Sequence, residues 1–188
     1  MNTRKLNNKP SFKPNVSPRK VIQMGAFGGT YWRPLKNCLN DKMMVNDYKK
    51  LPKSYWNGIP THKLVTPYAK YNKNINKYKV KTGTTYEFWC KKKWIRPSHP
   101  RGWYQWYCMY KSGKRTAYDA IEIKRWLRFA GPKGRFRLWL ITQIQKKGGK
   151  WNDYSIAPKL RQNLLEWGYE LNKRDFDKEV KRRRRKNT

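Results

Sequence analysis

The chain has 188 residues, the length of one domain or of one domain with tails, and a formal net charge of +35 from 46 Lys and Arg against 11 Asp and Glu. A fold with that charge repels itself, so we expect a polyanionic partner, with nucleic acid favoured over an anionic membrane surface. The 10 Trp and 13 Tyr argue against disorder throughout, because disordered chains are poor in aromatic residues. No stretch approaches about 18 apolar residues, so we expect no membrane span. The N-terminal region lacks the apolar segment of a secretory signal, so we expect a protein that is not secreted.

Residues 1–23 predict a basic, disordered arm. This segment has no acidic residue and carries only scattered apolar side chains among Lys, Arg, Asn, Pro and Ser. A plain disordered tail and an arm that binds phosphates or wraps a scaffold have the same composition, so both interpretations stay open.

An extended, irregular structure with short strands is predicted for residues 24–115. Three prolines between residues 47 and 82 exclude a long helix from that segment. Alternation of apolar and polar residues predicts short strands at Tyr78–Lys81 and, in part, at Thr85–Trp89.

The stretch Gly102–Tyr110, GWYQWYCMY, places five aromatic rings in nine residues. Such rings either stack on nucleic-acid bases or form the wall of a hydrophobic core. Arranged as a strand, both faces of this stretch are apolar or aromatic, whereas a base-stacking strand alternates aromatic with charged residues. We therefore expect these rings to build the core, with one or two of them left at a groove.

The C-terminal half predicts three or four short helices with tight connections. Thr116 and Asp119 have the spacing of a capping box, and apolar residues follow at helical spacing. Pro and Gly then mark the ends of further helices. The expected helices cover about 116–130, 135–147, 158–168 and a fourth that begins after an Asn172 cap.

The predicted fold class is α+β, with one folded domain over residues 24–180. Its extended part covers 24–115, and a small bundle of three or four helices covers 116–180. A basic tail follows over residues 181–188.

Catalysis and metal binding have weak support. The three candidate carboxylates for a metal-dependent nuclease, Glu87, Asp119 and Glu122, are dispersed along the chain. The three cysteines and two histidines lack CxxC or paired-His spacing, so we predict no metal site, no cofactor and no catalytic residue. The odd number of cysteines argues against a disulfide scaffold and favours buried thiols in a reducing compartment.

The strongest signal is the combination of basic and aromatic side chains, because Lys and Arg bind phosphates and exposed rings stack on bases. The segment Gly131–Arg135, GPKGR, is the most specific candidate phosphate site, since N–H groups at the start of a helix also favour anions. The run Lys181–Lys186 has the composition of a nuclear-localisation signal and equally that of a solvated tail. The predicted nucleic-acid-binding residues are Lys91, Lys92, Lys93, Arg96, Arg101, Lys114, Arg115, Lys124, Arg125, Arg128, Lys133, Arg135, Arg137, Arg182, Arg183, Arg184 and Arg185.

Several aromatic and glycine-containing blocks occur in a fixed order. They include GAFGGTYWRP (25–34), GWYQWYC (102–108) and GPKGR (131–135). Through these blocks, residues 24–177 resemble a poorly characterised family of small basic proteins found in large eukaryotic DNA viruses and in some algae and fungi. The resemblance carries over no catalytic residue. It implies a protein that is packaged with DNA or lies under a capsid.

Three functions therefore compete. The favoured one is a non-enzymatic, virion-associated structural protein that binds nucleic acid, with DNA favoured and with capsid proteins as further partners. The alternative is a minor capsid or scaffold protein that ties coat subunits together, its basic side facing the genome. The third is an enzyme acting on DNA. The expected location is the virion or the host nucleus or cytoplasm.

Overall fold

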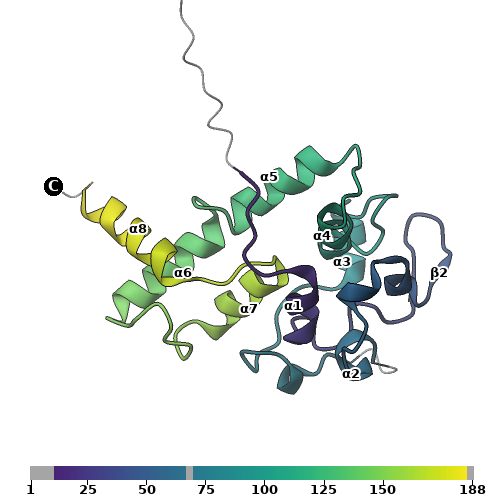
Figure 1. The fold of residues 1–188 in the computed structure, drawn as a ribbon, viewed down its shortest axis with the longest axis horizontal. Helices are drawn as coiled ribbons and strands as arrows, with labels where there is room; N and C mark the ends of the chain where they lie inside the picture. The colour runs from purple at the N-terminus through teal and green to yellow at the C-terminus, as the bar shows by residue number, and fades with distance from the viewer. Residues whose placement is uncertain (1–10, 67–69, 186–188) are drawn as a thin grey trace, which may run out of the picture.

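The computed structural model describes residues 11–66 and 70–185, and helices dominate this part of the chain (Figure 1). A single two-stranded antiparallel sheet pairs β1 (Leu35–Lys36) with β2 (Met43–Met44) within the described residues. Both helix and sheet are present, which is compatible with the α+β class. The α-helices are α1 (Pro18–Gln23), α2 (Thr61–Leu64), α3 (Tyr86–Lys91), α4 (Trp103–Lys111), α5 (Asp119–Phe129), α6 (Arg135–Lys146), α7 (Pro158–Glu166) and α8 (Lys173–Arg184). Short 3₁₀ turns cover Asp47–Lys50, Lys53–Tyr55 and Lys73–Ile75.

The aromatic stretch after Gly102 forms helix α4 and not a strand. Its rings recur three and four residues apart, so Trp103, Trp106 and Tyr107 share one side of the helix. Tyr104 on another side is also buried. A helix that is apolar around most of its circumference belongs inside the protein. The prediction that these rings build the core is confirmed, and the expected strand is wrong.

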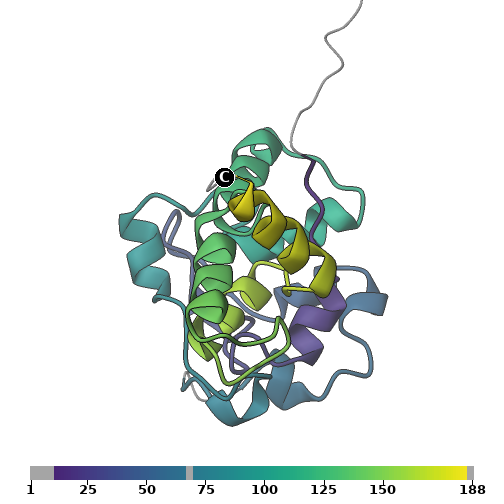
Figure 2. The same ribbon diagram turned by 90° about the vertical axis from the view of Figure 1, so that its left-hand side faces the viewer.

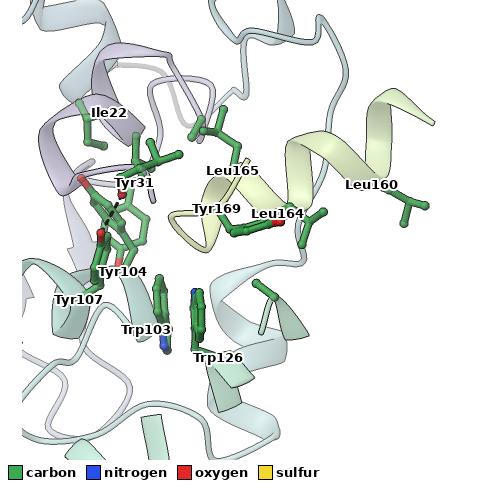
Figure 3. Packing of buried hydrophobic residues seen from close by; sticks show 14 of the residues in the cluster. Ile22, Tyr31, Trp103, Tyr104, Tyr107, Trp126, Leu160, Leu164, Leu165 and Tyr169 are labelled. Atoms are coloured by element: carbon green, nitrogen blue, oxygen red, sulfur yellow. Dashed lines mark hydrogen bonds between the residues drawn. The ribbon is translucent and has the colours of Figure 1, made fainter. Parts of the chain in front are cut away.

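The hydrophobic core joins the two halves of the chain. Trp103 of α4 and Trp126 of α5 lie close together beside Leu164 and Tyr169 (Figure 3). The Nε1–H of Trp126 donates to the carbonyl of Trp167 at 2.8 Å, so the indole is both packed and hydrogen-bonded. The helices after residue 116 therefore share their core with the N-terminal half.

The predicted disordered arm is wrong for residues 11–23, which pack against this core. Val16, Val21 and Ile22 are buried, and the ring of Phe12 lies 5.2 Å from that of Trp126. Helix α1 begins where the Ser17 hydroxyl accepts a hydrogen bond from the Lys20 N–H. The few apolar residues of the segment thus make tertiary contacts with the core. Residues 1–10 of the predicted arm lie outside the described residues.

Neither of the strands predicted from alternation forms. Tyr78–Lys81 is irregular, and the segment after Thr85 is helix α3. Thr85 caps that helix, because its hydroxyl accepts from the Phe88 N–H at 3.2 Å. The local capping interaction outweighs a short alternating pattern.

Cys38 and Cys90 form a disulfide, so the prediction of three unpaired, buried cysteines is wrong for these two. It links the hairpin of β1 and β2 to helix α3, across 52 residues of sequence. The inference of a reducing compartment rested on unpaired cysteines and does not follow from this pairing. Cys108 is free and buried, as predicted.

The four helices predicted after residue 116 are all present as α5 to α8. Asn172 caps α8 by accepting from the Asp175 N–H at 2.9 Å, as its position predicted. Helix α8 continues to Arg184, so the predicted tail is helical up to that residue. Figures 1 and 2 show α8 lying along α6, to which Arg183 donates hydrogen bonds. Residues 186–188 lie outside the described residues.

Candidate nucleic-acid interface

A cleft of about 990 Å³ lies between the segments around α3 and helices α4 to α7. A cleft of this volume is large enough for a nucleotide-sized group. Two sets of side chains give it its character. The first set, here called the cleft rings, consists of Trp89, Trp94, Trp103, Phe129, Phe136 and Trp167. The second set, the cleft arginines, consists of Arg96, Arg125, Arg128 and Arg135.

The cleft rings include a stacked ladder contributed by separate helices. Phe136 of α6 stacks on Phe129 of α5 with 3.9 Å between ring centroids, and Phe129 stacks on Trp167 at 4.6 Å. Trp167 in turn lies 4.6 Å from Trp103. Trp94 lines the cleft from the loop after α3 and is 40% exposed. Neighbouring rings thus cover the faces of Phe129 and Trp167, and Trp94 is the most exposed of the cleft rings.

Arg125 places its guanidinium among these rings. It lies 5.3 Å from the centroid of Trp94 and 5.6 Å from that of Trp167. The carboxylate of Glu122, one turn earlier on α5, accepts from its Nη1 at 2.7 Å. Cation–π contacts and this ion pair hold the side chain in place. Arg125 is thus a fixed part of the cleft.

Arg128 and Arg135 are exposed cations at the rim. The guanidinium of Arg135 lies 5.1 Å from the ring centroid of Phe136. No carboxylate in the described part of the chain lies within ion-pair distance of either arginine. Both charges are therefore available to an anionic ligand.

The segment Gly131–Arg135 is the turn from α5 to α6 and borders the cleft. A Cβ on Gly131 would lie 2.6 Å from the Leu127 carbonyl oxygen, and one on Gly134 would lie 2.6 Å from the Phe129 backbone. The glycines thus permit a close turn, which presents Lys133 beside Arg135. The sequence-predicted phosphate site and the cleft are neighbours.

Glu166, the last residue of α7, is the acidic member of the cleft lining. The Thr82 hydroxyl donates to its Oε1 at 2.6 Å. Desolvation by the surrounding protein raises the pKa of this carboxyl to about 8, although the Thr82 hydrogen bond acts in the opposite direction. Its protonated form therefore predominates at neutral pH.

Arg101 and Arg137 were predicted to bind nucleic acid, and the structure shows that both are buried structural residues. Arg101 is 1% exposed and pairs through Nε with Asp47 at 2.7 Å. Arg137 pairs with Asp175 at 3.1 Å and thereby ties α6 to α8. Sequence spacing alone does not distinguish a solvated arginine from one that neutralises a buried carboxylate.

The remaining predicted residues do not line the cleft. Lys91, Lys92 and Lys93 are exposed at the end of α3, and Lys114, Arg115 and Lys124 are exposed around α4 and α5. At the end of α8, Arg182 and Arg183 share the carboxylate of Glu179, whose pKa they lower to about 2. Arg184 and Arg185 are exposed. Four of the 17 predicted residues, the cleft arginines, thus meet at one site.

Sequence reasoning missed the cleft rings as ligand-facing groups, and it missed Glu166. Phe136, Trp167 and Glu166 are absent from the predicted site residues. The sequence feature that points to this site is that Arg125, Arg128 and Arg135 each lie next to an aromatic residue in the sequence. This feature does not show which helices lie close together in the fold.

The three candidate carboxylates of the nuclease hypothesis, Glu87, Asp119 and Glu122, have different structural surroundings. Asp119 accepts from the Trp106 Nε1–H at 2.8 Å, Glu122 is buried beside His99, and Glu87 lies in the first turn of α3. Within residues 11–66 and 70–185, no group of three or more His, Cys, Asp or Glu is placed to hold a metal ion. The metal-dependent nuclease hypothesis gains no support from their positions.

None of the described helices combines the length and apolarity needed to cross a membrane.

Comparison with protein-family models, with curated proteins and with solved structures found no match to this chain in any of the three.

Proposed function

We propose that this protein is a non-enzymatic nucleic-acid-binding protein that holds a single-stranded segment across the cleft. The observation that carries the proposal is the meeting of the cleft arginines and the cleft rings in one cleft. Guanidinium groups bind phosphates, and aromatic faces stack on unpaired bases of any identity. Rings and cations placed together in one groove are the combination that binds single strands.

The charge of the whole chain supports the same proposal. At +35 the protein attracts any polyanion, and Arg128 and Arg135 bring exposed positive charge to the cleft itself. In the setting that the family resemblance implies, the strand belongs to a viral genome and the protein is packaged with it. A scaffold role would use the same charge without using the rings.

The salt dependence of binding tests this function. If about ten phosphates are engaged, log K for a single strand of roughly 20 nucleotides falls with log salt at a slope near −7. Replacing Arg128, Lys133 and Arg135 together by Ala makes the slope shallower by about 2, because each lost phosphate contact removes about 0.7. Fluorescence anisotropy at several salt concentrations measures both slopes.

The matched control replaces Lys42, Lys49 and Lys50, which are exposed and do not line the cleft. This triple Ala variant loses the same charge and is expected to keep the wild-type slope. A wild-type slope shallower than about −3, or equal changes in the two triple variants, contradicts the proposal.

A further inference from the structure

The position of Glu166 is unusual for an acid in so basic a protein. It lines the cleft together with the four cleft arginines, yet it forms no ion pair with any described Lys or Arg. By contrast, Glu170 on the same chain segment pairs with Lys77 at 2.6 Å. The carboxyl of Glu166 is thus left for a different kind of partner.

One oxygen of this carboxyl is fixed, and the other is open. The Thr82 hydroxyl holds Oε1 at 2.6 Å. Oε2 forms no hydrogen bond with the described residues, and the nearby Gly83 carries no side chain to cover it. A Cβ at Gly83 would lie 3.5 Å from Oε2. The carboxyl therefore presents a hydrogen-bonding edge that is oriented by Thr82.

We infer that Glu166 hydrogen-bonds the edge of one unstacked base that lies against the cleft rings, so that the cleft recognises a base as well as the strand. This inference rests on the proposed function. Trp94 supplies an exposed ring face, and Glu166 supplies a carboxyl in the same cleft lining. Buried base-binding sites combine these two elements.

The protonation state of Glu166 decides which base edges it fits. A protonated carboxyl offers one donor and one acceptor, which complements the adjacent acceptor and donor of adenine or cytosine. An ionised carboxylate offers only acceptors, which suits the two adjacent N–H donors of guanine and repels the ring acceptor of adenine. Because burial raises the pKa of Glu166 to about 8, the protonated form acts at neutral pH.

The other groups that face Glu166 keep their charge states across this range. The cleft arginines are the other charged side chains of the cleft lining. Tyr71, which interacts electrostatically with Glu166, has a pKa raised to about 12, mainly by burial. Thr82 does not titrate. A change in base binding near pH 8 is thus attributable to Glu166.

The test measures the binding of the full-length protein to short oligonucleotides. Every position in these strands is an abasic site except the central one, which carries adenine or guanine. At about pH 6.5 adenine is expected to improve binding over the all-abasic strand roughly tenfold, the scale of one stacked and hydrogen-bonded base. Raising the pH to about 8.8 lowers this gain about sevenfold, as the protonated fraction of a group with pKa about 8 falls. The gain from guanine does not fall.

Glu166→Gln is the matched variant, because its amide keeps a donor and an acceptor at every pH. It is expected to retain the gain from adenine at both pH values, whereas Glu166→Ala loses part of that gain at both. Identical pH profiles for wild type and Glu166→Gln, or no gain from adenine over the all-abasic strand, overturn the inference. The proposed function fails separately if the all-abasic strand itself does not bind with a slope that depends on Arg128, Lys133 and Arg135.

Discussion

Replacing Arg101 by Ala is expected to lower the free energy of unfolding by about 3–5 kcal/mol. The guanidinium is 1% exposed and donates to Asp47 and to the backbone carbonyls of Tyr31, Arg33 and Met44. Removing it leaves a buried carboxylate and three carbonyl groups without their donor, and such groups are costly to bury. Thermal and urea denaturation, followed by circular dichroism, measure the loss.

Two further variants make this measurement specific. Arg128→Ala removes an exposed arginine and is expected to change stability by less than about 0.5 kcal/mol. Arg101→Lys keeps the charge but cannot reproduce a planar fork of donors, so most of the loss should remain. If Arg101→Ala were as stable as Arg128→Ala, the bonds of Arg101 to Asp47 and to the three backbone carbonyls would not contribute to stability as expected.

Replacing Glu166 by Gln is expected to stabilise the fold by about 1–3 kcal/mol at pH 8, after allowance for the partial exposure of the side chain. Burial raises the pKa of Glu166 from an ordinary 4.5 to about 8 in the folded state. Between these values the folded chain binds one proton more than the unfolded chain at this site. Its contribution to stability is therefore fully present below about pH 4.5 and is lost as the pH rises to about 8.

The glutamine amide does not titrate and can still accept the hydrogen bond of Thr82. The difference in unfolding free energy between Glu166→Gln and wild type should therefore grow from about pH 4.5 to about pH 8 and then level off. Urea denaturation at several pH values measures it. Asp177→Asn, at an exposed position on α8, is the control and should show no such growth. A constant difference for Glu166→Gln across this range would show that the carboxyl is not desolvated.

The helices of the C-terminal half were predictable because each carries its own start and stop signals. Asn172 with Asp175 and the Gly131–Pro132 pair act through neighbouring backbone groups, so they are readable without tertiary contacts. The rings of α4 were correctly placed in the core because every side of the stretch is apolar. Its helical form was missed, since five rings in nine residues satisfy both strand and helix spacing.

The errors share a cause, which is dependence on distant partners. Val21 and Ile22 are two of the few apolar residues in a basic segment, yet both are buried by packing against distant parts of the chain. Cys38 and Cys90 are 52 residues apart, so no local sequence spacing predicts their disulfide. Arg101 belongs to a basic run in the sequence, but Asp47 lies 54 residues away and determines its role. Within the candidate site, the sequence identified the cleft arginines and could not show that they meet the rings.

Cross-linking can show whether nucleic acid lies across the cleft. A single strand with photoreactive pyrimidines is bound to the full-length protein and irradiated, and the modified peptides are identified by mass spectrometry. We expect cross-links to Trp94, Phe136 and Trp167, which are lost when free single strand competes. Cross-links confined to the terminal segments 1–10 and 186–188, with the cleft rings unmodified, would contradict it.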